Sequence, residues 1–161
     1  MSKAITIGSS VWLAHNAFLD AAKVGPTSRN CANYLVYAVE NLIIAVWESE
    51  NIDRSSARRQ TGNHQIDRMI DLLPDLCTAK RTLQPLGVLT AYATTFRYAS
   101  PSGRIPKAPA VTMVQGWLDQ TQIAIDMFAR HFQVNLKDDE PVAEHTGPFR
   151  ESRDKDDFEP N

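Results

Sequence analysis

The stretch of residues 29–49, RNCANYLVYAVENLIIAVWES, constrains the fold more than any other, because most of its side chains are apolar. A polar set made of Asn33, Tyr37, Glu40 and Asn41 interrupts it, at spacings of four, three and one residues. On a helix with about 3.6 residues per turn, positions with this spacing share one stripe. Apolar side chains cover the rest of the circumference, so the stretch predicts a central helix that its neighbours cover on nearly every side.

Glu40 is the unusual member of this polar stripe. A buried carboxylate needs a cation or hydrogen-bond donors nearby, because an isolated buried charge is too costly to retain. Two interpretations follow. Glu40 either makes a structural ion pair or hydrogen bond, for which Arg97 is one candidate partner, or it belongs to a functional site. The sequence leaves both open.

Caps and helix breakers divide the rest of the chain into further helices. Apolar residues recur at helical spacing over residues 11–23, 64–73, 85–98 and 110–134. Ser9 and Ser10 are candidate caps for the first of these helices, whereas residues 51–63 and 99–109 lack a period and predict loops. No segment shows the alternation of a strand. We therefore predict an all-α domain over residues 9–136, an antiparallel bundle of four to five helices.

Charge is unevenly distributed along the chain. Residues 137–161 contain nine acidic and four basic residues, a net charge of −5, whereas the whole chain carries −2. Large apolar residues are few there, so we predict that residues 137–161 form a disordered acidic tail. Residues 54–107 contain nine basic and three acidic residues, a net charge of +6. Most of these bases are arginines, whose planar guanidinium can donate two parallel hydrogen bonds to a phosphate.

The strongest candidates for a phosphate site come from the central helix, the fourth predicted helix and the proline-containing loop after it. These candidate nucleotide- or RNA-binding residues are Glu40, Tyr92, Arg97, Tyr98, Arg104 and Lys107. Arg97 and Tyr98 end the fourth helix, so they lie beside the basic loop. Two alternatives stay open: Arg97 pairs with Glu40 for a structural reason, or the bases form a solvated face.

Several function classes lack their signatures in this sequence. It contains no P-loop, dinucleotide-binding, zinc-protease or serine-hydrolase motif, and we expect neither a metal nor a cofactor. Cys31 and Cys77 have no partners at metal-binding spacing and predict reduced structural thiols. No apolar run reaches the roughly 18 residues of a membrane span, and the first residues lack the apolar segment of a signal peptide, so we expect none. We therefore expect a cytoplasmic protein without a membrane span.

Several landmarks occur in an order that resembles one family. They are Trp12 and Leu13 in the first helix, Ala38, Val39 and Glu40 in the second, His64 opening the third, Arg97 and Tyr98 closing the fourth, and a long last helix. This order resembles the HEPN family, small helical domains associated with nucleotides, over residues 9–134. The resemblance implies a bundle of four or five helices that commonly dimerises. Many relatives are RNA-cleaving toxins or effectors, and others bind nucleotides without cleaving or pair with a small nucleotidyltransferase.

The resemblance also implies a catalytic pattern, in which an arginine precedes a histidine by four to six residues on a late helix. There the histidine acts as general base on the ribose 2′-hydroxyl and the arginine stabilises the phosphorane, without a metal. The last helix of this chain instead has Arg130 next to His131, and neighbouring helical positions point about 100° apart. Arg59 and His64 match the spacing, from a predicted loop. A structural interpretation of His64, hydrogen-bonded near the second helix, stays open.

The residues and the resemblance together predict a HEPN-like domain that binds nucleotide or RNA phosphate. We expect it to be non-catalytic, or a weak metal-independent endoribonuclease through Arg59 and His64, within a toxin–antitoxin or defence pair. A homodimer and a nucleotidyltransferase are the expected partners, and Trp117 and Phe128 are candidate dimer contacts if they are exposed. The alternative is a helical dimerisation or protein-interaction module with no nucleic-acid role.

Overall fold

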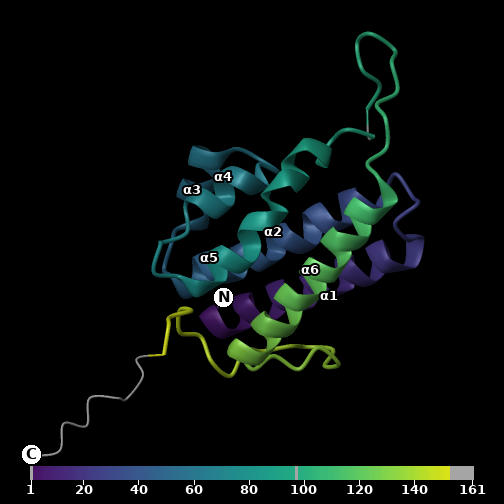
Figure 1. The fold of residues 1–161 in the computed structure, drawn as a ribbon. Coiled ribbons are helices and arrows are strands. Elements are labelled where there is room, and N and C mark those ends of the chain that lie inside the picture. Colours follow the sequence, from purple (N-terminus) through teal and green to yellow (C-terminus); the bar gives the residue numbers. More distant parts are fainter. Residues whose placement is uncertain (1, 97, 153–161) are drawn as a thin grey trace, which may run out of the picture.

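The computed structural model describes residues 2–96 and 98–152, which fold into helices and connecting segments (Figure 1). The described residues contain six α-helices and one 3-10 helix, and they contain no strand. The elements are α1 (Lys3–Val24), α2 (Cys31–Ser49), α3 (Arg54–Thr61), α4 (Ile66–Asp71), α5 (Thr78–Leu83), η1 (Gln84–Tyr92) and α6 (Val111–His131). The predicted all-α class is confirmed. Among these helices, none combines the length and the apolar character needed to cross a bilayer.

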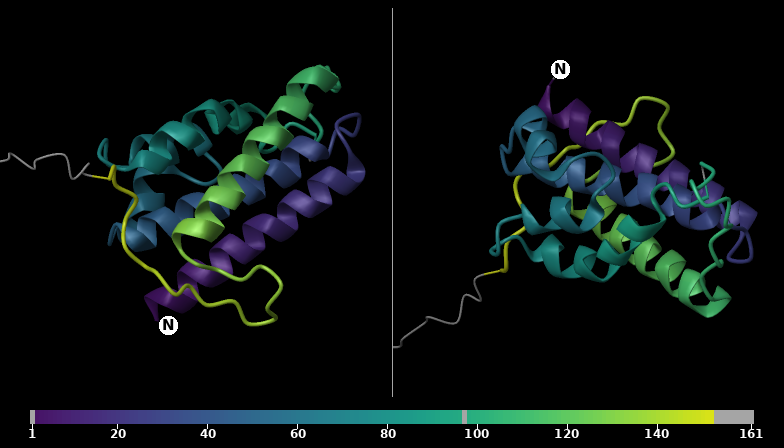
Figure 2. Two further views of the ribbon diagram at one scale, coloured as in Figure 1. Left: turned by 60° about the horizontal axis from the view of Figure 1, so that its bottom comes forward. Right: turned by 90° about the horizontal axis from the view of Figure 1, so that it is seen from above.

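α2 is the central helix, as the sequence predicts. It packs against the two long helices α1 and α6, and against the shorter α3, α4 and η1 (Figures 1 and 2). α1 runs antiparallel to α2. Lys3, at the start of α1, donates from Nζ to Asn51 Oδ1 just beyond the end of α2. Cys31, at the start of α2, has its Sγ 3.4 Å from the carbonyl oxygen of Ala21 near the end of α1. Contact with neighbours on several sides is the reason why α2 carries apolar residues around most of its circumference.

α1 is longer than the sequence predicts. It begins at Lys3 rather than near residue 11, because the Ser2 hydroxyl accepts a hydrogen bond from the backbone N–H of Ile5 at 3.3 Å and so caps the helix. Ser9 and Ser10, the predicted caps, lie inside the helix.

A short helix occupies the predicted loop of residues 51–63. α3 follows Asp53, whose carboxylate accepts from the backbone N–H of Ser56 at 2.8 Å, and Gly62 follows its last residue with a φ of 77°. Few of its residues are buried, so no apolar period marks α3 in the sequence. The α-helix predicted over residues 85–98 is also wrong in type, because this segment begins as the 3-10 helix η1, which ends at Tyr92.

Both cysteines are buried and unpaired, in agreement with the predicted reduced thiols. Burial raises the pKa of the Cys31 thiol to about 11, and burial also raises the pKa of Cys77. A thiol must lose its proton to become a nucleophile or a metal ligand. Neither cysteine is therefore suited to either role at neutral pH.

The candidate dimer contacts lie inside the subunit. Trp117 is 8% exposed and Phe128 is fully buried. The Trp117 ring lies 5.3 Å from that of Tyr92, and the Phe128 ring lies 4.8 Å from that of Phe149 and 6.0 Å from that of Phe132. Both residues are core residues, so neither offers a surface to a second subunit.

Residues 137–152, which we call the strap, leave the end of α6 and lie along the N-terminal half of α1 (Figure 2). The backbone N–H of Ala143 donates to the Ala4 carbonyl at 3.0 Å, and Phe149 is only 3% exposed. The predicted disorder is therefore wrong for the strap, because a few apolar anchors hold an otherwise acidic segment. Residues 153–161 of the predicted tail lie outside the described residues.

The far end of the strap is attached by charge. Arg150 donates to both carboxylate oxygens of Glu50, with Nη1–Oε1 and Nη2–Oε2 distances of 2.5 and 2.9 Å. The Glu50 side chain is 6% exposed. Because a bidentate pair is stronger when it is shielded from water, this contact fixes the end of the strap to the C-terminal end of α2.

The middle of the strap is held by His131 at the end of α6. His131 Nε2 lies 2.7 Å from the Gly147 carbonyl oxygen, which can only accept, so Nε2 carries the hydrogen. The imidazole stacks on Phe149 with ring centres 3.8 Å apart, and His145 lies edge-on at 4.8 Å. Burial lowers the pKa of His131 below its ordinary value of 6.5; the Gly147 bond opposes this shift, and the charge of His145 adds to it.

Gly8→Ala should loosen the strap. A Cβ at Gly8 would lie 2.5 Å from the Pro141 carbonyl oxygen, a backbone atom that cannot rotate away. We expect a loss of about 2 kcal/mol in the free energy of unfolding, measured by urea denaturation. Gly116→Ala in α6 is the matched control: its Cβ meets nothing within 4 Å, and better helix propensity should add up to about 1 kcal/mol. Equal changes in the two variants would contradict this packing.

Acidification should weaken attachment of the strap. Since the pKa of His131 is lower in the folded chain than its ordinary 6.5, the unfolded chain takes up a proton first as the pH falls. The contribution of His131 is complete above pH 6.5 and is lost as the pH falls toward the lower, folded value. We expect the urea midpoint to drop between pH 7.5 and pH 5.5, and to drop less in His131→Gln. The same drop in both proteins would show that His131 is not responsible.

Candidate functional site

Glu40 and His64 form a hydrogen-bonded pair between α2 and the segment that joins α3 to α4. His64 Nδ1 lies 2.8 Å from Glu40 Oε1, and the ring of Tyr37 approaches the imidazole edge-on with centres 6.4 Å apart. The Glu40 side chain is 7% exposed and that of His64 is 33% exposed. Of the interpretations left open for Glu40 and His64, a hydrogen bond between the two is the one that the structure contains.

The backbone between α3 and α4 turns His64 toward α2. Gly62 has a φ of 77° and His64 itself has a φ of 61°, a conformation that few residues other than glycine adopt. Such a backbone costs free energy and persists where its surroundings hold it. The bond to Glu40 and the ring contact with Tyr37 provide that restraint, so this corner depends on α2 for its shape.

The pair contains two kinds of group that acid–base chemistry uses. When Nδ1 donates to a carboxylate, the imidazole tautomer is fixed and Nε2 is left as the basic nitrogen. Arg59 is exposed on α3, and among the described residues no hydrogen bond or ion pair joins it to His64. Arg58 instead donates to Asn63 at 3.4 Å. Within the described residues there is also no cluster of acidic, histidine and cysteine side chains able to hold a metal ion.

A second cluster surrounds a hollow of about 440 Å³ at the start of α2. We call it the basic hollow; the residues that line it are Arg29, Asn30, Thr95, Phe96, Tyr98, Ala99, Ser100, Gly103, Arg104, Ile105 and Pro106. The loop after η1 provides most of this lining, and in Figure 1 it projects away from the helices. The hollow therefore combines two arginines with two aromatic rings.

Interactions within the basic hollow hold the loop against the start of α2. Arg29 Nη1 donates to the Pro106 carbonyl at 3.0 Å, and its guanidinium lies 5.2 Å from the centre of the Phe96 ring. Within the loop, the Ser100 hydroxyl donates to the Arg104 carbonyl at 3.1 Å. These bonds use the loop's carbonyl groups and one end of Arg29. They leave the Arg104 guanidinium outside any hydrogen bond or ion pair given by the described residues.

The electrostatics of the basic hollow favour an anion. None of the described lining residues is acidic. Asn30 precedes α2 and lines the hollow, and no side chain caps this end of the helix, so the positive end of the helix dipole lies beside the hollow. Tyr98 is 74% exposed, which leaves its ring free for contact with a flat ligand.

The predicted phosphate-site residues fall into separate places. Tyr98 and Arg104 line the basic hollow, and Lys107 is exposed one residue beyond Pro106. Tyr92 packs on the core through Trp117, as described above. Arg97 lies outside the described residues. Glu40 does not line the hollow: it is ten residues beyond Asn30, about 15 Å along a helix. A single recess that joins Glu40 to the basic loop is therefore not present.

Sequence reasoning missed Arg29 and Phe96 as part of this cluster. In the sequence, Arg29 stands at the start of the predicted central helix and Phe96 is an apolar residue of the fourth predicted helix. Their pairing depends on how the two ends of the loop after η1 meet the residue before α2, and the sequence signal for that contact is weak. No protein-family model, curated protein or solved structure matches this chain.

A double-mutant cycle should measure the coupling between Glu40 and His64. His64→Asn removes the imidazole but keeps a residue that tolerates positive φ. It should lower the free energy of unfolding by about 2 kcal/mol, because the carboxylate of Glu40 loses its partner at a site that is partly open to water. Glu40→Leu fills the space with an apolar side chain. The double variant should lose less free energy of unfolding than the sum of the two single losses, by about 1 kcal/mol or more.

The free energies of unfolding from chemical denaturation give the cycle. Arg59→Gln is the control on the same segment and should change stability by less than about 0.5 kcal/mol, because Arg59 is exposed. Strict additivity of the Glu40 and His64 substitutions would contradict the pair.

Proposed function

We propose that this chain is a HEPN-like domain that binds a nucleotide or single-stranded RNA at the basic hollow. The observation that carries the proposal is the gathering of Arg29, Arg104, Phe96 and Tyr98 around one concave surface with no acidic lining residue. The HEPN resemblance supports it, because proteins of that family are associated with nucleotides and RNA.

The chemistry of the lining supports binding of a nucleotide rather than of an arbitrary anion. Guanidinium groups bind phosphate through paired hydrogen bonds. Aromatic rings stack on nucleobases, which is the usual way in which proteins hold single-stranded nucleic acid without reading its sequence. Tyr98 and Arg104 both line the hollow, so we expect the ring to contact a base and the guanidinium to contact a phosphate of the same ligand. A volume of about 440 Å³ is within the range of small-ligand sites.

The proposal concerns binding and does not include cleavage. Cleavage would need a guanidinium beside the His64 imidazole to stabilise the phosphorane, and Arg59 makes no described contact with it. His64 contacts the middle of α2 through Glu40, whereas the basic hollow lies at the start of that helix. We further propose, from the resemblance alone, a cytoplasmic homodimer that acts in a toxin–antitoxin or defence pair with a small nucleotidyltransferase.

Anisotropy of a fluorescent single-stranded RNA of about 12 nucleotides tests the proposal, with ATP as a competitor. Binding should weaken steeply between 50 and 200 mM salt, roughly as expected for a few phosphate contacts. Arg104→Gln should weaken binding about 3- to 10-fold and make the salt dependence shallower by about one phosphate. Tyr98→Ala should weaken binding about tenfold through lost stacking.

Arg130→Gln is the matched control for Arg104→Gln. Arg130 is exposed near the end of α6, away from the basic hollow, and the substitution removes the same charge from the chain. Its effect on binding should be less than about twofold, because a distant exposed charge is screened by salt. Absence of binding at low salt, or equal effects of the two arginine substitutions, would refute the proposal.

A further inference from the structure

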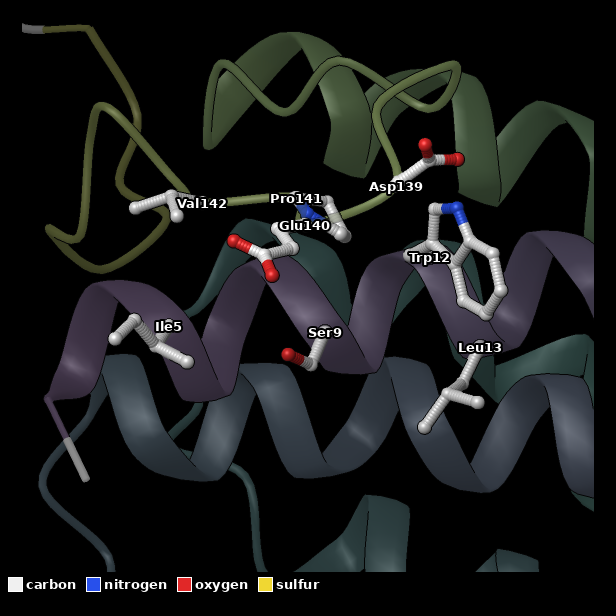
Figure 3. Close-up of a pocket in the computed structure, with 8 residues that line it drawn as sticks. All are labelled: Ile5, Ser9, Trp12, Leu13, Asp139, Glu140, Pro141 and Val142. Carbon is white, nitrogen blue, oxygen red and sulfur yellow. The ribbon is translucent and has the colours of Figure 1, made fainter.

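A groove of about 410 Å³ runs between α1 and the strap (Figure 3). We call it the strap groove; its lining residues are Ile5, Ser9, Trp12, Leu13, Asp139, Glu140, Pro141 and Val142. α1 provides one wall and the strap provides the other, as Figure 3 shows. It is a different surface from the basic hollow and shares no lining residue with it.

The wall formed by α1 is apolar and open to solvent. Ile5, Ser9 and Leu13 are four residues apart, so they lie along one face of the helix, with Trp12 beside them. Ile5 is 42% exposed and Leu13 is 48% exposed, and Val142 on the strap is 47% exposed. Apolar side chains that gather in one concave place indicate a binding surface more strongly than the same residues scattered singly.

The wall formed by the strap is acidic. Asp139 and Glu140 line the groove, and Asp138 and Glu144 are exposed on either side of them. The described residues place none of Asp139, Glu140 and Glu144 in an ion pair. Carboxylates without a partner at the edge of an apolar groove complement a ligand that carries both positive charge and large apolar side chains.

The groove is formed before any ligand arrives. The strap contacts α1 closely at Gly8, and the hydrogen bond from Ala143 to Ala4 ties the two walls together. Beyond the groove, buried Phe149 and the Arg150–Glu50 pair hold the rest of the strap. Since neither wall has to be ordered on binding, little of the binding free energy is lost to that step.

We propose that the strap groove is the docking site for a basic amphipathic segment of a partner protein. One or two large apolar side chains of that segment lie on Ile5, Trp12 and Leu13, and its lysines or arginines pair with Asp139 and Glu140. A second copy of this chain meeting groove to groove is disfavoured, because it would bring the carboxylates of the two straps together. The proposal does not depend on nucleotide binding at the basic hollow.

The probe is a 14-residue fluorescent peptide of leucine and lysine, designed as an amphipathic helix, added to the full chain at 50 mM salt. Its anisotropy should show saturable binding in the micromolar range. The same peptide with every lysine replaced by glutamate should bind at least about tenfold more weakly, because it meets the strap carboxylates with like charge.

Two variants of the chain test the two walls. Leu13→Asp should weaken binding of the basic peptide about tenfold by placing a charge on the apolar wall. The double variant Asp139→Asn with Glu140→Gln should weaken it about 3- to 10-fold and reduce its salt dependence. All three side chains are exposed, so neither variant disturbs the core.

Matched controls come from the same helix outside the groove. Leu19 is 47% exposed and Asp20 is exposed, and neither lines the groove. Leu19→Asp and Asp20→Asn should change peptide binding by less than about twofold, because they make the same chemical changes outside the groove.

Three results would overturn the proposal. The first is no binding of the basic peptide at about 1 mM chain. The second is equal weakening by the groove variants and their controls, which would show unspecific attraction. The third is a dimer in sedimentation velocity that Leu13→Asp dissociates, which would make a second copy the occupant.

Retention of peptide binding in Tyr98→Ala, whatever its effect on RNA, shows that the two sites are tested separately.

Discussion

The burial of α2 on most of its sides is the constraint on which the rest of the structure depends. A helix with so little polar surface is stable in water only when other elements cover it. α1, α6, α3, α4 and η1 share that task. Covering α2 also buries Glu40, and the only hydrogen bond that the described residues give its carboxylate is with His64. The conformation of the segment between α3 and α4 therefore depends on the hydrogen bond between His64 and the buried Glu40 of α2.

The two ends of α2 differ in chemistry as a result of what covers them. At its start, the loop after η1 contacts Arg29, and Arg104 of that loop lines the same hollow as Arg29. Near its end, the strap crosses α1 with its carboxylates and is fastened to Glu50. Positive and negative surfaces are separated in this way, which suits two ligands of opposite charge.

The sequence was most informative where periodicity and burial coincide. α2 and α6 were predicted because their apolar residues repeat over many turns. α3 was missed because its eight residues bury little, and its cap at Asp53 is a short-range signal that also occurs in loops. The strap was predicted to be disordered from its acidic composition. Phe149 and the pairing of Arg150 with Glu50 outweigh that composition, and both are contacts over long sequence separations.

The sequence by itself determined that this chain is all-α, that its second helix is central, and that Glu40 needs a partner there. These follow from local periodicity and from the cost of burying charge, which do not depend on the arrangement of distant segments. Only the tertiary structure decided that His64 is that partner, that Glu40 and Arg104 belong to different places, and that the strap forms a groove with α1. Each of these depends on which distant side chains meet, and the pairing of distant segments is set by the packing of the whole chain rather than by any local pattern.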